Sequence, residues 1–118
     1  MACVIIAQAQ VAGSPVLGVT ALELREATTL GWSAKRHVLG QPVFNDKGER
    51  VGAVDDIVFA PDMARSYAII GVGVFLGVGK RDVVIRLSQL MRRVDGQFVL
   101  AGATKDALSA LPGFEYAR

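Results

Sequence analysis

Residues 71–87, GVGVFLGVGKRDVVIRL, form a glycine-rich segment that passes into a run of alternating residues. Its four glycines, Gly71, Gly73, Gly77 and Gly79, lead into two basic residues, as glycines do in a phosphate-binding loop. The same composition is typical of a strand that bends sharply before a tight turn, as the corners of small barrels require. The segment is therefore either a nucleotide site or a barrel corner.

The nucleotide interpretation fails on motif and on context. A dinucleotide fingerprint, Gly-x-Gly-x-x-Gly, has its third glycine position at Leu76. A P-loop ending at Lys80 has its first glycine position at Val74, and Arg81 stands where the motif needs Ser or Thr. Residues 82–87 alternate as a strand does, so no helix N-terminus follows to hold phosphate. We therefore interpret the glycines as structural turn or corner residues and expect no nucleotide cofactor.

Turn signals about every ten residues divide the rest of the chain into short strands. The segment ending at Gly48 is a turn, and Asp95-Gly96 suits a two-residue type I′ hairpin turn. Thr104 begins the one convincing helix, which ends before Pro112. The expected strands are residues 42–44, 50–59, 66–72, 82–87, 90–93 and 98–100. This order predicts a mainly β fold, a small β-barrel with a short C-terminal helix.

The first 18 residues are interpreted as a signal-peptide remnant or a mobile leader. Residues 2–9 form a short apolar run that ends in Ala7-Gln8-Ala9, the small-x-small form of a signal-peptidase site. Cleavage after Ala9 would remove Cys3, the single cysteine, which suits an oxidising compartment. We expect export to the periplasm, with a cytoplasmic location as the alternative.

Residues 19–32 fit two periods. Alternate residues place Leu22, Leu24 and Leu30 on one face of a strand, whereas a helical stripe would have to include Glu26. The strand interpretation is favoured. We therefore expect residues 19–118 to form a single domain with an N-terminal strand extension.

Composition excludes several classes of protein. The chain has 118 residues, of which 52% are hydrophobic and 20% are charged, so it can bury a core and is not a disordered chain. Its net charge of +2 is spread along the sequence, whereas nucleic-acid binders gather basic residues on one face. We expect no nucleic-acid partner and no integral membrane segment in the mature domain.

Few residues could carry chemistry. His37 is the only histidine and has no marked nucleophile beside it, so neither a His-based metal site nor a catalytic triad is expected. Asp55 and Asp56 are adjacent, and neighbours on a strand face opposite sides unless a bulge intervenes. We expect no catalytic residue, no metal and no cofactor, and therefore no enzyme. Four aromatic residues in strand-like segments are expected in the core: Trp32, Phe44, Phe59 and Tyr67.

Six segments in this order resemble one known family. They are LGQPVFNDKGERVG (39–52), VDDI (54–57), GVFLGVG (73–79), DVVI (82–85), ATKDAL (103–108) and LPGFEY (111–116). Over residues 35–116 the chain resembles the PRC-barrel family, whose domain also occurs in the photosynthetic reaction centre H subunit and in a ribosome maturation factor. GWSAK (31–35) is similar to the stand-alone, exported members of alphaproteobacteria. The membrane helix and attached domains of the two named relatives have no match here, so their specific roles do not transfer.

The resemblance implies a small barrel that mediates protein–protein contact or assembly, with no catalytic residues to carry over. The protein partner is unknown, and a homodimer is one candidate assembly. The alternative is a small-ligand or lipid-binding β-barrel, because the apolar residues 72–76 could line a pocket as well as a contact. Val74, Phe75 and Leu76 form the candidate interaction surface, either as an exposed interface or as a plug that closes one end of the barrel.

Overall fold

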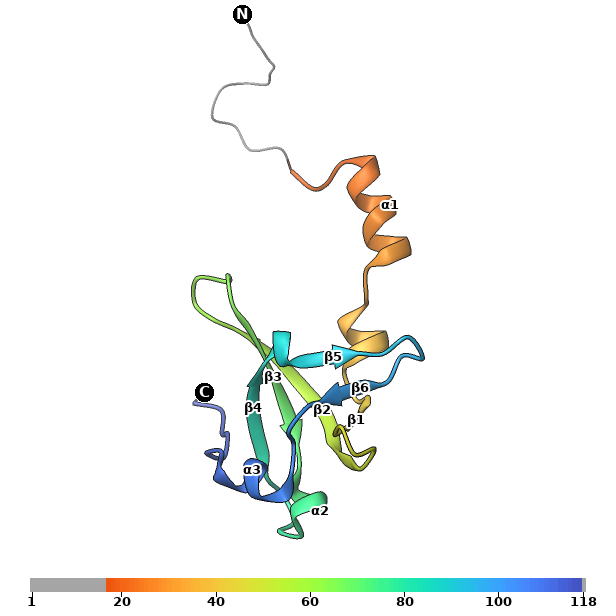
Figure 1. Cartoon of the computed structure of the whole chain (residues 1–118). Helices are drawn as coiled ribbons and strands as arrows, with labels where there is room; N and C mark the ends of the chain where they lie inside the picture. The colour runs from red at the N-terminus through yellow and green to blue at the C-terminus, as the bar shows by residue number, and fades with distance from the viewer. Residues whose placement is uncertain (1–16, 118) are drawn as a thin grey trace, which may run out of the picture. The chain divides into compact units, whose positions relative to one another are not determined.

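The structure, a computed structural model, describes residues 17–117. By its internal contacts the chain divides into two units, Met1–Trp32 and Ser33–Arg118. Helix α1 (Ala21–Leu30) belongs to the first unit, and the other helices and all the strands belong to the second (Figure 1). The expected cleavage site after Ala9 lies outside the described residues.

Residues 21–30 form a helix, so the strand extension expected for this segment is wrong. Thr20 caps the helix: its Oγ1 accepts a hydrogen bond from the Glu23 N–H at 3.1 Å, and Glu23 Oε1 accepts one from the Thr20 N–H at 3.2 Å. Gly31 ends the helix by donating its N–H to the carbonyls of Ala27 and Glu26. None of the ten residues of the helix is buried, so core packing does not determine its structure, and the signals at its two ends do so instead.

Six strands form one mixed sheet (Figure 1). They are β1 (Pro42–Phe44), β2 (Arg50–Phe59), β3 (Ser66–Gly71), β4 (Asp82–Arg86), β5 (Leu90–Arg92) and β6 (Phe98–Leu100). Their order across the sheet is β4-β3-β2-β1-β6-β5, and all neighbours are antiparallel except β1 and β6, which run parallel. A short helix, α3 (Lys105–Ala110), follows β6. The expected fold class, mainly β with a short C-terminal helix, is confirmed.

Strands β4 and β5 follow each other in the chain yet lie at opposite edges of the sheet. Only the 3₁₀ turn η2 (Leu87–Gln89) separates them. The sheet therefore curls until its two edges lie on the same side of the core. Within the described residues no strand pairing joins the two edges, so the barrel is open along one seam.

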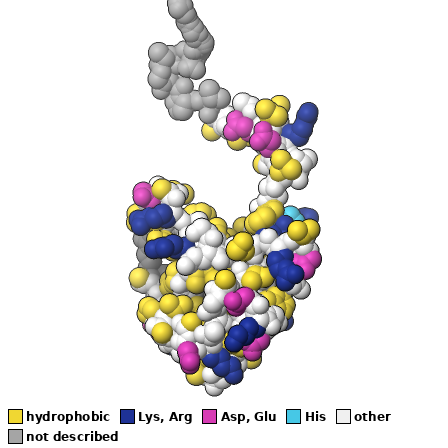
Figure 2. All heavy atoms as spheres, in the orientation of Figure 1, with side chains coloured by type: hydrophobic (Ala, Val, Ile, Leu, Met, Phe, Trp, Pro, Cys, Tyr) yellow, Lys and Arg dark blue, Asp and Glu magenta, His cyan; other side chains and the backbone are white. Residues whose placement is uncertain are grey.

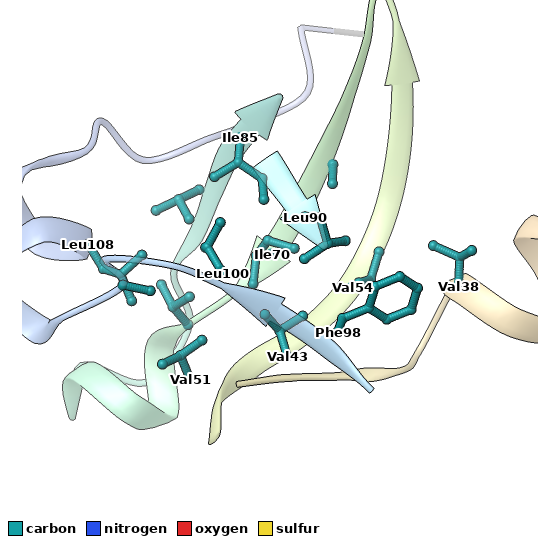
Figure 3. Close-up of a cluster of buried hydrophobic side chains, with 14 residues drawn as sticks. Val38, Val43, Val51, Val54, Ile70, Ile85, Leu90, Phe98, Leu100 and Leu108 are labelled. Atoms are coloured by element: carbon teal, nitrogen blue, oxygen red, sulfur yellow. The ribbon is translucent and has the colours of Figure 1, made fainter. Parts of the chain in front are cut away.

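One cluster of buried apolar side chains fills the space that the curled sheet encloses (Figure 3). Val83 and Ile85 point inward on β4, as the alternation of that segment predicts. Helix α3 closes one end through Leu108, which is 2% exposed. The cluster consists of Val38, Val43, Val51, Val54, Ala68, Ile70, Val72, Val83, Ile85, Leu90, Phe98, Leu100, Ala103 and Leu108. These side chains leave the barrel interior filled rather than hollow.

Two of the four aromatic residues expected in the core lie at the surface. Trp32 is 56% exposed and Phe59 is 58% exposed, whereas Phe44 and Tyr67 are half-buried. Phe59 is the last residue of β2 and pairs with the first residue of β3, where the hairpin extends beyond the core. An aromatic residue in a β pattern is therefore not sufficient to predict burial here.

The hairpin between β5 and β6 has a three-residue loop, so the expected two-residue type I′ turn is wrong. The Arg93 N–H donates to the Gln97 carbonyl at 2.7 Å, and the Gly96 N–H donates to the Arg93 carbonyl at 2.9 Å. A type I′ turn needs positive φ at both central residues, but Asp95 is not in the left-handed region and only Gly96 is, at φ 90°. The loop therefore contains Val94 in addition to the expected turn residues Asp95 and Gly96.

The hairpin between β1 and β2 has the same three-residue form. The Asn45 N–H donates to the Glu49 carbonyl, and Gly48 takes φ 81°. Asn45 is 2% exposed, and its side chain is fully engaged: Oδ1 accepts from the N–H groups of Lys47 and Glu49, and Nδ2 donates to Glu49 and to the Ala103 carbonyl. This asparagine therefore ties the hairpin to the segment that precedes α3.

Candidate interaction surface

The glycine-rich segment between β3 and β4 forms a single helical turn, α2 (Gly73–Leu76), followed by a tight loop. A Cβ on Gly73 would lie 1.8 Å from the Gly79 carbonyl oxygen, so only glycine permits this approach of the two backbones. Gly77 and Gly79 take φ angles of 74° and 79°, which favour glycine. Gly71 is the last residue of β3. A segment expected to be a loop between strands therefore contains a short helix.

The three residues of the candidate surface separate into two groups. Val74 is 93% exposed and points into solvent. Phe75 and Leu76 are half-buried and pack against the core cluster, and the Lys105 ammonium lies 5.5 Å from the centre of the Phe75 ring. Phe75 and Leu76 thus cover the end of the barrel, and Val74 projects from it.

A shallow groove adjoins Val74. It has a volume of about 430 Å³ and is lined by Arg50, Val51, Gly52, Ala53, Gly71, Val74 and Phe75. The strands approach closely here, because a Cβ on Gly52 would lie 2.1 Å from the Gly71 carbonyl oxygen. We call Val74 and this groove the α2 surface. It places an exposed apolar side chain beside a depression lined by small residues.

A bulge in β2 brings two carboxylates to the same face. Val54 pairs with Ile70 and Asp56 pairs with Ile69, so Asp55 has no partner on β3. The Asp55 Oδ2 atom lies 2.7 Å from the position that a Cβ on Gly71 would take, on the outward side of the sheet. Asp55 and Asp56 therefore do not face opposite sides, because the bulge breaks the alternation.

The environment of these carboxylates shifts two pKa values. Burial raises the pKa of Asp55, and a hydrogen bond with the Asp82 carboxyl raises it further, while Lys80 acts in the opposite direction. The pKa of Tyr116 is raised first by its hydrogen bond to Asp56, in which the phenol donates to Oδ2 at 2.6 Å. Carboxylates from β2 and β4 thus lie close to a residue near the end of the chain.

A scan against family models matches the PRC-barrel domain over residues 34–108. The chain belongs to the PRC-barrel family. No curated protein matches the chain. The matched residues include the whole six-stranded sheet and the first part of α3, so the PRC-barrel match lies within the sheet-containing unit, Ser33–Arg118.

The PRC-barrel unit carries mixed charges. On the face in Figure 2, Lys and Arg side chains are interspersed with Asp and Glu and form no single basic patch. Among residues 17–117 no group of three or more His, Cys, Asp or Glu side chains could hold a metal ion. His37 lies in the π-helical turn η1 (Ala34–Val38), where its Nδ1 accepts the Ser33 N–H at 2.9 Å. None of the helices described between residues 17 and 117 combines the length and hydropathy needed to span a bilayer.

The residues of α2 are recognisable in the sequence as a candidate surface, whereas the residues that surround them are not. Gly52 and Ala53 border the groove because β2 pairs with β3, a relation that depends on strand order. Asp82 and Tyr116 join the two aspartates through contacts between distant parts of the chain. The alternation of Phe114 and Tyr116 after a helix end was the local signal that could have drawn attention to this region.

Proposed function

We propose that this PRC-barrel protein is a non-enzymatic interaction or assembly module that contacts a protein partner through the α2 surface. The observation that carries the proposal is Val74, an apolar side chain 93% exposed at the tip of the glycine-rich segment. An exposed apolar residue beside an apolar groove is the usual composition of a contact site. The groove gives a partner's side chain a place to insert.

A second copy of the chain is a suitable partner for this surface. Contacts across a two-fold axis require that one patch complement itself. The α2 surface has both parts, because the exposed Val74 side chain lies next to a groove lined by Gly52, Ala53 and Gly71. In a homodimer each Val74 would enter the groove of the other protomer.

The filled interior supports a protein contact over a ligand-binding barrel. Val43, Val54 and Ile70 are all 0% exposed in the centre of the barrel. A site for a small molecule or a lipid is normally a concave pocket that encloses most of its ligand. The groove of the α2 surface is shallow, which suits an inserted side chain better than an enclosed molecule.

The substitution Val74→Arg tests the proposed function. Val74 contributes little to the core, so the variant should keep its melting temperature while losing self-association in analytical ultracentrifugation, or losing its partner in a pull-down from native extract. Val94→Arg is the matched control, because Val94 is also fully exposed but lies on the hairpin between β5 and β6. The proposed surface is refuted if Val74→Arg retains every association of the native protein.

We also propose that the protein is exported. The support is the Ala7-Gln8-Ala9 pattern, which precedes the described residues. Protein recovered from the periplasm should then begin at Gln10 when its N-terminus is determined by mass spectrometry. Native cytosolic protein that begins at Met1 would contradict export without bearing on the α2 surface.

A further inference from the structure

The segment that follows α3 is fastened across the sheet at three points. We call residues 111–116 the C-terminal strap; Figure 1 shows the chain after α3 running beside β4. Arg81 Nη2 donates to the Leu111 carbonyl at 2.5 Å, and the Phe114 N–H donates to the Asp82 carbonyl at 2.8 Å. The third contact joins the Tyr116 hydroxyl to Asp56 Oδ2. The anchors lie on both sides of β3.

Two of the anchors, Asp82 on β4 and Asp56 on β2, lie on either side of β3, so the strap runs across the outward face of β3. Ile69 shares this face: it pairs with Asp56 on β2 and with Val84 on β4, whereas its neighbour Ile70 points into the core. Ile69 is nevertheless only 1% exposed, although the barrel core does not include it. An outward apolar side chain that is fully buried needs a cover, and the strap, anchored at Asp82 on one side of β3 and at Asp56 on the other, is the segment placed to supply it.

The contacts of the strap define what this face recognises. One contact is a backbone N–H donated to the edge of β4, which any extended peptide can supply. One contact is specific: the Tyr116 hydroxyl donates to the Asp56 carboxylate, and within the strap the Phe114 ring supports the Tyr116 ring edge to face, with centroids 4.9 Å apart. Residues two positions apart in an extended segment point to the same side, so Phe114 and Tyr116 can present their rings together.

The strap does not fill the space around it. A groove of about 650 Å³ remains between the strap and the loop before β4, lined by Lys80, Arg81, Asp82, Gly113, Phe114, Glu115 and Tyr116. Tyr116 itself is 61% exposed. The strap is therefore held by a few contacts at a face that retains room for larger side chains.

We propose that the outward face of β2, β3 and β4 is a docking site for an extended peptide with an aromatic-x-tyrosine sequence, and that the C-terminal strap occupies this site as a displaceable internal ligand. The partner is a protein that carries such a segment. The site is independent of the α2 surface, because it uses Asp56, Ile69 and Asp82 rather than Val74. A tethered segment acts at an effective concentration on the order of millimolar, so a partner must bind well enough to exceed that concentration.

A synthetic peptide tests the proposal on the full chain. The probe is LPGFEYAR, the sequence of residues 111–118, with a fluorophore at its N-terminus. The double variant Phe114→Ser, Tyr116→Ser should release the strap and bind the peptide at least about tenfold more tightly than the native protein, whose site is already occupied. Amide shifts in nuclear magnetic resonance spectra should move at Asp56, Ile69 and Asp82.

Two controls distinguish specific recognition of the peptide from nonspecific binding. The peptide LPGSESAR, in which both aromatic residues are replaced, should not shift these amide signals. Asp56→Asn, added to the double variant Phe114→Ser, Tyr116→Ser (the open variant), should weaken binding of LPGFEYAR. Asp95→Asn is the matched protein control, because Asp95 lies on a distant hairpin loop. Equal affinity of the native and open proteins, or no shift on the face of a folded open variant, overturns the proposal.

Tyr116→Phe covers the case in which the double variant does not fold. It removes only the hydroxyl that donates to Asp56 and keeps both aromatic rings. Because the tether then holds less firmly, the peptide should bind about threefold more tightly than it binds the native protein. Unchanged peptide affinity in this variant also overturns the proposal.

Discussion

Gly73 lies where two backbone segments approach more closely than a side chain allows. The Gly79 carbonyl oxygen would be 1.8 Å from a Cβ on Gly73, and the Arg81 amide nitrogen would be 2.8 Å from it. Both neighbours are backbone atoms, so neither can turn aside as the end of a side chain can. Glycine is required here for the space it leaves rather than for its φ angle.

Gly73→Ala should therefore destabilise the barrel. Forcing a methyl group into a filled site costs about 1–3 kcal/mol, and the backbone contact places this variant at the upper end. Chemical denaturation followed by circular dichroism measures the loss. Val74→Ala, next in sequence but 93% exposed, should change the unfolding free energy by less than about 0.5 kcal/mol. Equal stability of the two variants would contradict the close approach.

Asp55 should make stability depend on pH. Its pKa is raised in the folded protein by burial and by the Asp82 carboxyl, so its favourable contribution is complete below the ordinary carboxyl pKa and is lost as the pH rises through the raised pKa. Once the pH exceeds this raised pKa, the Asp55 carboxylate lies beside Asp82 and Asp56, with Lys80 as the opposing charge. Replacing it with a neutral residue should then be stabilising.

The test is the melting temperature of Asp55→Asn relative to the native protein. The variant should melt a few degrees higher at neutral pH, and this advantage should fade as the pH falls below the ordinary carboxyl pKa of 3.8; the effect is small because Asp55 is only partly shielded from solvent. Asp95→Asn, on the hairpin between β5 and β6, should show no such trend. A constant difference at every pH would show that Asp55 acts through the bulge geometry and not through its charge.

Helix α3 packs against the barrel through a single buried side chain. The helix has six residues, and Leu108 is the only buried one among them. Thr104 caps it through a hydrogen bond from the Ala107 N–H at 3.1 Å. Leu108 therefore connects the end of the barrel to the segment from which the strap begins.

Leu108→Ala should cost about 2–5 kcal/mol, because it leaves a cavity at the end of the filled core. Chemical denaturation measures this loss, and Ser109→Ala serves as the control on the same helix, since Ser109 is exposed. A loss below about 1 kcal/mol would mean that α3 is dispensable for the barrel.

The elements that sequence reasoning predicted well are those with local signals. The alternation of β4 and the Thr104 cap of α3 lie within a few residues of the structure they determine. The strand prediction for residues 19–32, which relied on a weak alternation of apolar residues, was wrong. The Thr20–Glu23 capping box and the terminal Gly31 determine a helix here, and that helix has no buried residue. The strand signals of the hairpins were right, but one extra residue changed the turn type between β5 and β6.

What the sequence could not predict depends on the whole molecule. The bulge at Asp55 arises from the register of β2 against β3, and no residue near it signals that register. Tyr116 and Asp56 are 60 residues apart in the sequence, so their contact exists only after the sheet has formed. The division of the α2 residues into exposed Val74 and half-buried Phe75 and Leu76 likewise depends on what the end of the barrel presents to them.

The parallel pairing of β1 with β6 has a consequence for folding kinetics. The strands β1 to β4 form one run of sequential neighbours, β5 and β6 form another, and only the β1–β6 ladder joins the two runs within the sheet. That ladder has two residue pairs, against six between β2 and β3, and its formation closes a loop of most of the domain. It should form last and open first. In hydrogen exchange, the amides of Phe44 and Val99 should therefore lose protection before those of β2 and β3. A folding intermediate should have the runs β1–β4 and β5–β6 formed, with β1 and β6 not yet paired.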